Sequence, residues 1–346
     1  MFSLLTNLRP TPYPNSFEIF GIEIAFYAVI ILSGALICAT IGYLLFAKKL
    51  GLSVDDVTEG VAIGLLCGIV GARLYYVLFN HEGLTTFWEV INPRNGGLAI
   101  HGGIIATAIF LPTFCKIKKL NLIYLMEIVV PIFLTCQVIG RWGNFMNQEA
   151  FGPMIDTIGG LTLDNIKAAS ISGTGGMFDP YIMSDSVLEA QRSTMNGWLI
   201  PNFIVDQMYI ENGWILLDGK EVYISGYYHP TFLYESLMNL LIVIFMYVGR
   251  KHIKKYYVGD SLGVYLVGYG IVRFIIESLR TDPLTIGNTG IKIATVISVL
   301  FVLLGILILV LRRVFKFQLK SCYELFYTEG QTMIIKEEKK EEEVNE

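Results

Sequence analysis

Charged and hydrogen-bonding side chains lie inside long apolar segments of this sequence, where burying them is costly. Arg273 and Glu277 are four residues apart in the apolar segment 259–280, and Tyr269 precedes Arg273 by one helical turn. Ionisable side chains within membrane-crossing segments are rare, and they pair with one another or form functional sites. A purely structural ion pair at this i,i+4 spacing is one interpretation. It leaves the other polar residues at the same depth unexplained.

Other apolar segments carry polar residues at the corresponding level. His101 opens the segment 98–115 within the string GGLAIHGG, and Tyr27 lies near the start of the segment 19–46. The string GRWGNFMNQEAFG supplies Arg141, Asn144, Asn147, Gln148, Glu149 and Gly152. The string HPTFLYES supplies His229, Tyr234 and Glu235, and the segment 58–80 supplies Arg73. Helices containing these segments would bring the polar groups to one level of a bilayer.

The residue types at this level indicate phosphate chemistry. Two or more arginines suit a phosphate group, because guanidinium groups bind its oxygens through paired hydrogen bonds. A neutral histidine such as His101 can accept a proton from a nucleophile near pH 7. Carboxylates such as Glu277 and Glu149 can orient arginines or bind hydroxyl groups. The sequence has no HExxH, GxSxG or P-loop motif, and its five cysteines lack metal-ligand spacing. We therefore predict group transfer on a phospholipid to an external nucleophile, with no metal and no other cofactor.

The elements that must position these residues are membrane-spanning helices. The chain of 346 residues is 53% hydrophobic and only 16% charged, with a mean hydropathy of +0.56, whereas soluble domains carry about 25% charged residues. A bilayer-crossing helix needs about 20 mostly apolar residues. Seven segments qualify, at residues 19–46, 58–80, 98–115, 121–142, 230–249, 259–280 and 292–311. The predicted fold class is an all-α polytopic membrane protein with about seven transmembrane helices.

Basic residues in alternate connections predict the orientation. Those that follow the first, third, fifth and seventh segments are Lys48, Lys49, Lys116, Lys118, Lys119, Arg250, Lys251, Lys254, Lys255, Arg312, Arg313 and Lys316. Connections rich in lysine and arginine remain cytoplasmic. We therefore expect the N-terminus outside, the C-terminus in the cytoplasm and the polar residues in the outer leaflet.

The predicted organisation has four parts. They are a membrane core 1–152 with four spans, an external head insert 153–228, a second core part 229–317 with three spans, and an acidic cytoplasmic tail 318–346. The tail ends in KEEKKEEEVNE and is expected to be disordered or loosely helical. No basic patch indicates nucleic acid as a partner. The roles of the insert and the tail, and the oligomeric state, do not follow from the sequence.

The string GRWGNFMNQEAFG resembles the signature of the bacterial prolipoprotein diacylglyceryl transferase family. That signature is a G-R-x-G-N-F-x-N-x-E pattern that ends in an aromatic residue and a glycine. Similar strings are HGG at 101–103, GARLYYVLF at 71–79, HPTFLYE at 229–235 and GYGIVRFIIESLR at 268–280. The resemblance extends over all seven predicted spans, but not over most of the insert or the tail.

The resemblance implies a reaction at the bacterial cell membrane. The diacylglyceryl group of phosphatidylglycerol would move to the lipobox cysteine thiol of a preprolipoprotein signal peptide, forming a thioether and releasing glycerol phosphate. The expected partners are phosphatidylglycerol, these signal peptides and membrane lipids. The catalytic candidates are His101, Arg141, Arg273 and Glu277. By resemblance, the residues that line the lipid site are Tyr27, Asn144, Glu149, Gly152 and Tyr269.

Roles within this set are partly open. Arg141 and Arg273 would meet the developing charge of the leaving phosphate, with Glu277 holding Arg273. His101 is either the base for the thiol, whose ordinary pKa is about 8.5, or a positioning group. The relative weight of Arg73 and Arg280, and the acyl-chain preference, stay undecided.

A transporter or flippase for an anionic lipid or solute is the alternative function. It would use the same arginines as a relay and would need access from both sides of the membrane. The ionisable residues gather almost wholly in one half of the predicted bilayer, and Glu127 and Glu59, toward the other side, are interpreted as structural. This asymmetry favours the enzyme.

Overall fold

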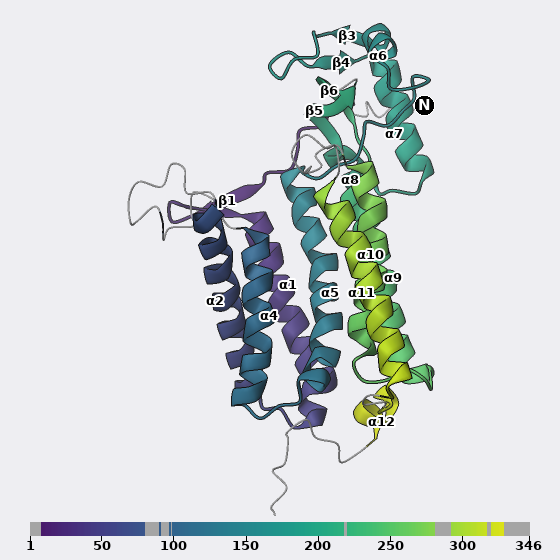
Figure 1. Cartoon of the computed structure of the whole chain (residues 1–346). Helices are drawn as coiled ribbons and strands as arrows, with labels where there is room; N and C mark the ends of the chain where they lie inside the picture. Colours follow the sequence, from purple (N-terminus) through teal and green to yellow (C-terminus); the bar gives the residue numbers. More distant parts are fainter. Residues whose placement is uncertain are drawn as a thin grey trace, which may run out of the picture. The chain divides into compact units, whose positions relative to one another are not determined.

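Seven long helices dominate the computed structural model, which describes residues 8–79, 90, 97, 99–217, 220–280, 292–316 and 320–328 (Figure 1). They are α1 (Phe26–Gly42), α2 (Val54–Phe79), α4 (Ile100–Ile117), α5 (Leu122–Asn147), α9 (Thr231–His252), α10 (Asp260–Leu279) and α11 (Ile293–Val314). A π-helical turn, Tyr43–Ala47, and a 3-10 turn, Lys48–Leu50, extend α1. Within the described residues, six helices are long and apolar enough to cross a membrane, and α4 has a shorter apolar stretch, His101–Ile117. The prediction of a mainly helical polytopic membrane protein is confirmed.

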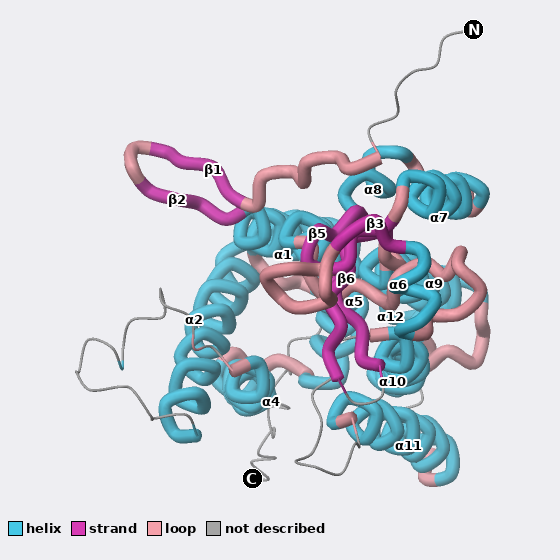
Figure 2. The backbone as a smooth tube through the Cα atoms, turned by 90° about the horizontal axis from the view of Figure 1, so that it is seen from above, coloured by secondary structure: helices cyan, strands magenta, loops and turns pink. Residues whose placement is uncertain are grey.

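The chain before α1 differs from the predicted span 19–46. Its residues form the strands β1 (Ser16–Ile19) and β2 (Ile22–Ala25), an antiparallel hairpin that leads directly into α1. Apolar and polar residues alternate here with a period of two, which favours strands over a helix. Phe20 and Gly21 form the turn with positive φ angles of 51° and 78°, as tight two-residue hairpins require. Figures 1 and 2 show the hairpin running sideways from the start of α1.

The chain divides into two compact units. Unit 1 consists of Met1–Ala35, Leu134–Phe245 and Gly263–Ile308. Unit 2 consists of Leu36–Phe133, Met246–Leu262 and Leu309–Glu346. Several long helices therefore contribute one part to each unit.

Unit 1 contains a small α/β head within the predicted insert. Its helices are α6 (Leu163–Ala169), α7 (Asp185–Gly197) and α8 (Asn202–Gln207). Its strands are β3 (Ser170–Ser172), β4 (Tyr181–Met183), β5 (Tyr209–Leu217) and β6 (Lys220–Tyr227), in the order β3-β4-β6-β5. Only the β4–β6 pairing is parallel. Gln191 of α7 is buried and bonds to the Ile155 carbonyl and the Tyr227 amide, which ties α7 to the sheet.

The head is joined to the last turn of α5 by buried amide groups. Gln207 Nε2 donates to the Phe145 carbonyl at 3.2 Å. Gln148 Nε2 donates to the carbonyls of Gln207 and Tyr209 at 2.7 and 3.1 Å. Phe145 also packs in the apolar core of the head. These contacts fix the chain just beyond α5, where the signature string lies.

Unit 2 contains α2 and α4, which pack closely through glycine. A Cβ atom on Gly102 would lie 2.1 Å from the Gly71 carbonyl oxygen, and one on Gly71 would lie 2.6 Å from that of Gly102. Small residues allow such close backbone approach between membrane helices. The glycines that follow His101 therefore serve helix packing.

The tail contains a short ordered helix, α12 (Cys322–Tyr327), also in unit 2. Ser321 forms an isolated β-bridge with Tyr257, and the Cys322 amide donates to the Tyr256 carbonyl at 3.0 Å. Cys322, Leu325 and Phe326 are buried. The helix lies in the chain between the basic end of α11 and the acidic terminus. A packed helix here differs from the disordered or loosely helical tail that was expected beyond residue 317.

Candidate active site

Four charged residues of unit 1 form a continuous ion network, which we call the site cluster. It consists of Arg141, Glu235, Arg273 and Glu277. Arg141 Nη2 lies 2.6 Å from Glu235 Oε1, and Arg273 Nη1 lies 3.5 Å from Glu235 Oε2. Arg273 Nη2 lies 2.8 Å from Glu277 Oε2. The network links α5, α9 and α10, so the pairing of Arg273 with Glu277 is part of a larger arrangement.

Burial differs sharply between the acids and the bases of the site cluster. The side chains of Glu235 and Glu277 are 2% and 3% exposed, whereas those of Arg141 and Arg273 are 20% and 18% exposed. A guanidinium group has five N–H donors, so each arginine can bind a carboxylate and still present donors to a ligand. The buried acids can hold two guanidinium groups in place for an anion.

Tyrosines from two helices adjoin Arg141. Tyr269 of α10 is close enough to Arg141 to interact with its charge. Tyr27 of α1 is close enough to Arg141 and Glu149 to interact with both charges. Its ring lies against Gly143, where an added Cβ atom would be only 2.5 Å from Tyr27 Cδ2. The glycine in GRWGN thus makes room for Tyr27 beside the arginine.

The chain beyond α5 curls so that Glu149 faces back toward the helix. Gln148 and Ala150 adopt positive φ angles of 49° and 55°, an unfavourable conformation for residues with a side chain. Glu149 Oε1 accepts hydrogen bonds from Asn144 Nδ2 at 2.8 Å and Asn147 Nδ2 at 3.4 Å. Such strain is typical of functional sites held by their surroundings. Glu149 is exposed, so its carboxylate can contact a ligand.

Gly152 occupies a joint between three segments. Its amide donates to the His229 carbonyl at 2.9 Å, and the His229 amide donates to the Pro153 carbonyl at 3.0 Å. A Cβ atom on Gly152 would lie 2.9 Å from His229 Cβ and 3.0 Å from Thr231 Cγ2. The need for glycine here is therefore steric, because any side chain would push apart the start of α9 and the loop after α5.

His229 forms a small polar group with aromatic neighbours. Its Nδ1 atom lies 3.1 Å from the Tyr234 hydroxyl oxygen, and its ring stacks on Trp198 at 5.3 Å between centroids. Burial lowers the pKa of His229 below its ordinary value of 6.5. This histidine is consequently neutral at pH 7.

His101 lies in unit 2, whereas the other eight predicted site residues lie in unit 1. His101 is exposed in the first turn of α4, and its ring is 5.8 Å from that of Tyr75. Arg73, also in unit 2, donates from Nε to the Val90 carbonyl at 2.9 Å and from Nη1 to the Gly97 carbonyl at 2.8 Å. Arg73 thus binds backbone carbonyls.

Two residues at the site were not among the predicted ones. Glu235, which contacts both arginines, was noted in HPTFLYES but not selected as a site residue. Its acidic side chain, four residues after α9 begins at Thr231, is the signal that could have identified it. Lys292 Nζ donates to the Glu277 carbonyl at 2.8 Å. No motif marked this lysine, because its contact depends on how α11 packs against α10.

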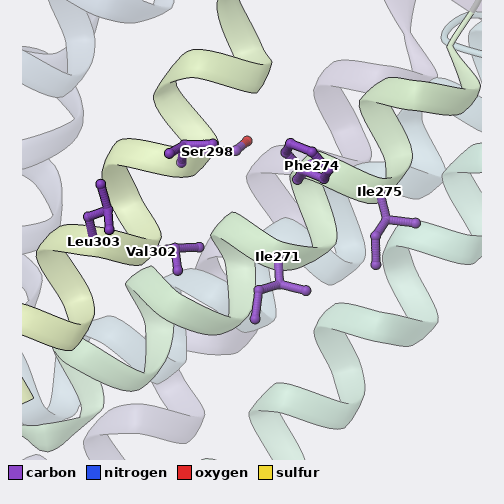
Figure 3. Close-up of a pocket in the computed structure, with 7 residues that line it drawn as sticks. Ile271, Phe274, Ile275, Ser298, Val302 and Leu303 are labelled. Atoms are coloured by element: carbon purple, nitrogen blue, oxygen red, sulfur yellow. The ribbon is translucent and has the colours of Figure 1, made fainter.

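An apolar groove runs between α10 and α11 in unit 1 (Figure 3). Its volume is about 180 Å³, and it is lined by Ile271, Phe274, Ile275, Ser298, Val299, Val302 and Leu303. Ile271 and Ile275 flank Arg273 in the sequence of α10. The Ser298 hydroxyl donates to the Ala294 carbonyl at 2.7 Å, so it adds little polarity to the groove.

The helices and the site cluster define a polytopic membrane protein in which a buried carboxylate holds two arginines together. The sequence model of the prolipoprotein diacylglyceryl transferase family matches residues 14–311. The chain therefore belongs to this family of membrane transferases, as its signature string predicted.

Similar proteins agree over most of the chain. A phosphatidylglycerol–prolipoprotein diacylglyceryl transferase 1 of Clostridium perfringens is 35% identical over 298 residues, which are 86% of this chain and 94% of that protein. A phosphatidylglycerol–prolipoprotein diacylglyceryl transferase of Clostridium novyi is 34% identical, over 86% of this chain and 95% of its own. One of Staphylococcus xylosus is 33% identical, over 87% and 90%. The family match stops before α12.

Proposed function

We propose that this transferase moves the diacylglyceryl group of phosphatidylglycerol to the lipobox cysteine of preprolipoprotein signal peptides. The observation that carries this proposal is the site cluster, where buried Glu235 holds Arg141 and Arg273 together. The side chains of Arg141 and Arg273 are 20% and 18% exposed, so neither arginine is fully enclosed. Paired guanidinium groups suit a phosphodiester, and at a membrane the abundant phosphodiesters belong to lipid headgroups.

The reaction balances without any group beyond the two substrates. The cysteine thiol loses its proton, and the sulfur attacks the glyceryl carbon that carries the phosphate. A C–S bond forms as the C–O bond to phosphate breaks, and the bonding electrons leave with the phosphate oxygen. Arg141 and Arg273 stabilise the departing glycerol phosphate, because its negative charge grows where their N–H groups point.

His101 is the proposed acceptor of the thiol proton. A neutral imidazole is a suitable base near pH 7. Glu149 and Asn144 are proposed to bind the headgroup glycerol hydroxyls, since their side chains are hydrogen-bonded to each other at the end of α5 and Glu149 is exposed. The groove between α10 and α11 suits an acyl chain, given its apolar lining.

The proposed location is the outer leaflet of the bacterial cell membrane, with the N-terminus outside and the C-terminus in the cytoplasm. The distribution of lysine and arginine between alternate connections supports this orientation. A signal peptide anchored in the same leaflet would bring its cysteine to the level of the lipid phosphate.

A transfer assay with defined components tests the function. Purified protein in liposomes would receive phosphatidylglycerol and a synthetic lipobox peptide, with a Cys→Ser peptide as the matched control. The expected result is a mass gain of one diacylglyceryl unit on the cysteine peptide alone, with release of glycerol phosphate. No modification by folded, lipid-bound protein would contradict the proposal, and anionic lipid flux would then become the activity to measure.

The role of His101 has its own test. His101→Ala should slow thiol attack far more than it weakens lipid binding, because only the deprotonation step is lost. Transfer rates measured at several pH values should rise with pH in this variant, as the thiolate forms without assistance. A uniformly low rate at every pH would assign His101 to positioning.

A further inference from the structure

The hairpin β1–β2 has two chemically different faces. Side chains alternate between the faces of a strand, and the antiparallel register keeps directly paired residues on the same face. One face consists of Phe17, Ile19, Ile22 and Ile24. The opposite face consists of Ser16, Glu18, Glu23 and Ala25. The hairpin is thus amphipathic, and Phe20 adds an apolar residue at its tip.

The outer part of the apolar face is uncovered by the described chain. Phe20 is fully exposed at 101%, and Ile22 and Ile19 are 61% and 44% exposed. Only the base of the hairpin is packed, where the ring of Phe17 lies 5.0 Å from that of Phe26. A group of three large exposed apolar side chains at a loop tip indicates a surface that contacts another apolar surface.

The polar face of the hairpin contains a stabilising hydrogen bond, but its charged side chains need to remain in water. Ser16 Oγ donates to Glu23 Oε1 at 2.6 Å, and Glu18 stands directly opposite Glu23. Adjacent carboxylates favour water, since removing either charge from water is costly. An isolated two-stranded hairpin is marginally stable in water, so cover for the apolar face would also stabilise the fold.

The hairpin leads directly into a helix that is long and apolar enough to cross a membrane. Strand β2 ends at Ala25 and α1 begins at Phe26 with no linker, and the Phe26 amide donates to the Asn15 carbonyl at 2.9 Å. Val29 and Leu32 of α1 are exposed apolar residues suited to lipid. The hairpin runs sideways from this end of α1 (Figures 1 and 2). Its apolar residues therefore continue the lipid-facing surface of α1 at the level where a spanning helix leaves the bilayer.

We infer that β1–β2 is a membrane anchor that lies in the bilayer interface on the side where α1 begins. Ile19, Phe20 and Ile22 enter the boundary between headgroups and acyl chains, and Glu18 and Glu23 remain in water. Amphipathic elements bind membranes in this way through their buried apolar area. The anchor fixes the depth of the next turn of α1, which carries Tyr27.

Spin-label accessibility in bilayers tests this inference independently of enzyme activity. Phe20→Cys and Glu18→Cys would each be made in the full chain with the half-buried Cys67 and Cys136 replaced by alanine. After nitroxide labelling, the protein would be reconstituted in vesicles of phosphatidylcholine and phosphatidylglycerol. Accessibility to oxygen, which concentrates in the bilayer, would be compared with accessibility to a water-soluble nickel chelate. The unsubstituted background provides the correction for residual labelling.

The anchor predicts an oxygen-to-nickel accessibility ratio severalfold higher at position 20 than at position 18. Ile22→Cys and Glu23→Cys repeat the comparison on the partner strand, in case one label disturbs the hairpin. Equal nickel accessibility at positions 20 and 18, and at 22 and 23, would overturn the inference, because both faces would then be in water. Shielding of all four labels from both reagents would also overturn it, by indicating a protein cover.

Discussion

Two groups of buried charges in this protein draw on the same three helices yet differ in how they are enclosed. The site cluster uses residues in the last turns of α5 and α10 and the first turns of α9. The second group, which we call the sealed cluster, consists of Glu127, Arg250, Tyr256, Ser261 and Cys322 in unit 2. From the sequence, Glu127 is interpreted as structural, and its pairing with Arg250 was not predicted.

The sealed cluster satisfies its charges within the protein. Glu127 and Arg250 are both 0% exposed, with Arg250 Nε 2.9 Å from Glu127 Oε1. Glu127 Oε2 accepts hydrogen bonds from the amides of Gly259 and Ser261 at 2.6 and 3.3 Å. The Arg250 guanidinium also donates to the Glu127 carbonyl. Both oxygens of the Glu127 carboxylate therefore accept hydrogen bonds from groups of the protein itself.

Aromatic rings close the sealed cluster around Arg250. The guanidinium carbon lies 5.2 Å from the ring centroid of Phe46, 5.7 Å from that of Tyr247 and 5.3 Å from that of Phe326. Phe326 belongs to α12, so the tail helix supplies one wall. Cation–π contacts stabilise a desolvated guanidinium. The residues needed for this enclosure extend beyond the segment that matches the family.

Partial exposure of the arginine side chains, more than the presence of ion pairs, distinguishes the site cluster from the fully enclosed ion pair. In the site cluster the acids are buried and the arginines remain partly open. In the sealed cluster both partners are fully covered, and they are hydrogen-bonded to each other and to neighbouring protein groups. Buried charges alone are therefore insufficient evidence for a polar path from both sides, and the transporter alternative gains nothing from Glu127.

The largest expected effect is on stability, from opening the sealed cluster. Arg250→Ala and Glu127→Ala should each lower the free energy of unfolding by about 3–5 kcal/mol, because one buried charge loses its partner. Denaturation midpoints in detergent measure this, with the double variant Glu127→Met/Arg250→Met as the control that removes both charges and should be less destabilised. Transfer per folded molecule should stay near the parental rate. If the Arg250 or Glu127 variant lost transfer activity with unchanged stability, the sealed cluster would not be purely structural, and the distinction between the two clusters would be wrong.

The next effect is on catalysis, from the arginines of the site cluster. Arg141→Ala and Arg273→Ala should reduce transfer by at least about 10²–10³-fold, since each supplies donors to the leaving phosphate. The protein should remain inserted and folded by its denaturation midpoint. Arg→Lys variants are matched controls that keep the charge without the planar fork, and they should recover only part of the rate. Near-normal turnover in either alanine variant would exclude that arginine from the site.

A smaller effect should distinguish the two acids of the site cluster. Glu235→Gln should reduce transfer by about 10- to 100-fold, because hydrogen bonds between charged groups contribute about 1.5–3 kcal/mol. Glu277→Gln should cost less, as Glu277 pairs with Arg273 whereas Glu235 contacts both arginines. Steady-state transfer rates of the two variants test the order. Unchanged activity in Glu277→Gln would assign its pair to structure alone.

The smallest expected effect is a pH dependence of stability from His229. Burial lowers its pKa in the folded state, so on acidification the unfolded chain binds a proton first. The stability contribution is complete above about pH 6.5 and is lost as pH falls toward the folded-state pKa. Denaturation midpoints would be measured at about pH 7.5 and about pH 5.5. The decrease in midpoint from the higher to the lower pH should be smaller in His229→Gln than in the parent. An equal fall in both would remove His229 as the source.

Local pattern was sufficient to predict the helices and to nominate candidate site residues. Arg273 and Glu277 share a face because they are one turn apart, and the string GRWGNFMNQEAFG made Arg141 and Asn144 candidates before any packing was known. Residues 16–25 alternate with a period of two, which favours strands, but their apolar content led to the wrong prediction of a span from residue 19. Element boundaries near a membrane surface are obscured when strands are themselves apolar.

Contacts between segments distant in sequence needed the fold. The bridging role of Glu235 requires α5, α9 and α10 to meet, and the steric role of Gly152 requires the start of α9 to lie against the loop after α5. The pairing of Glu127 with Arg250 spans 123 residues. No local spacing can encode such a separation.

By itself, the sequence determined that this protein lies in a membrane and which family of transferases it belongs to. Its apolar segments require a membrane, and its signature strings place arginine, asparagine, glutamate and glycine in a membrane transferase family. Only the tertiary structure decided which charges are available to a ligand. The reason is physical, because a charge acts on a substrate when packing leaves part of it open, and packing depends on residues that are far apart along the chain.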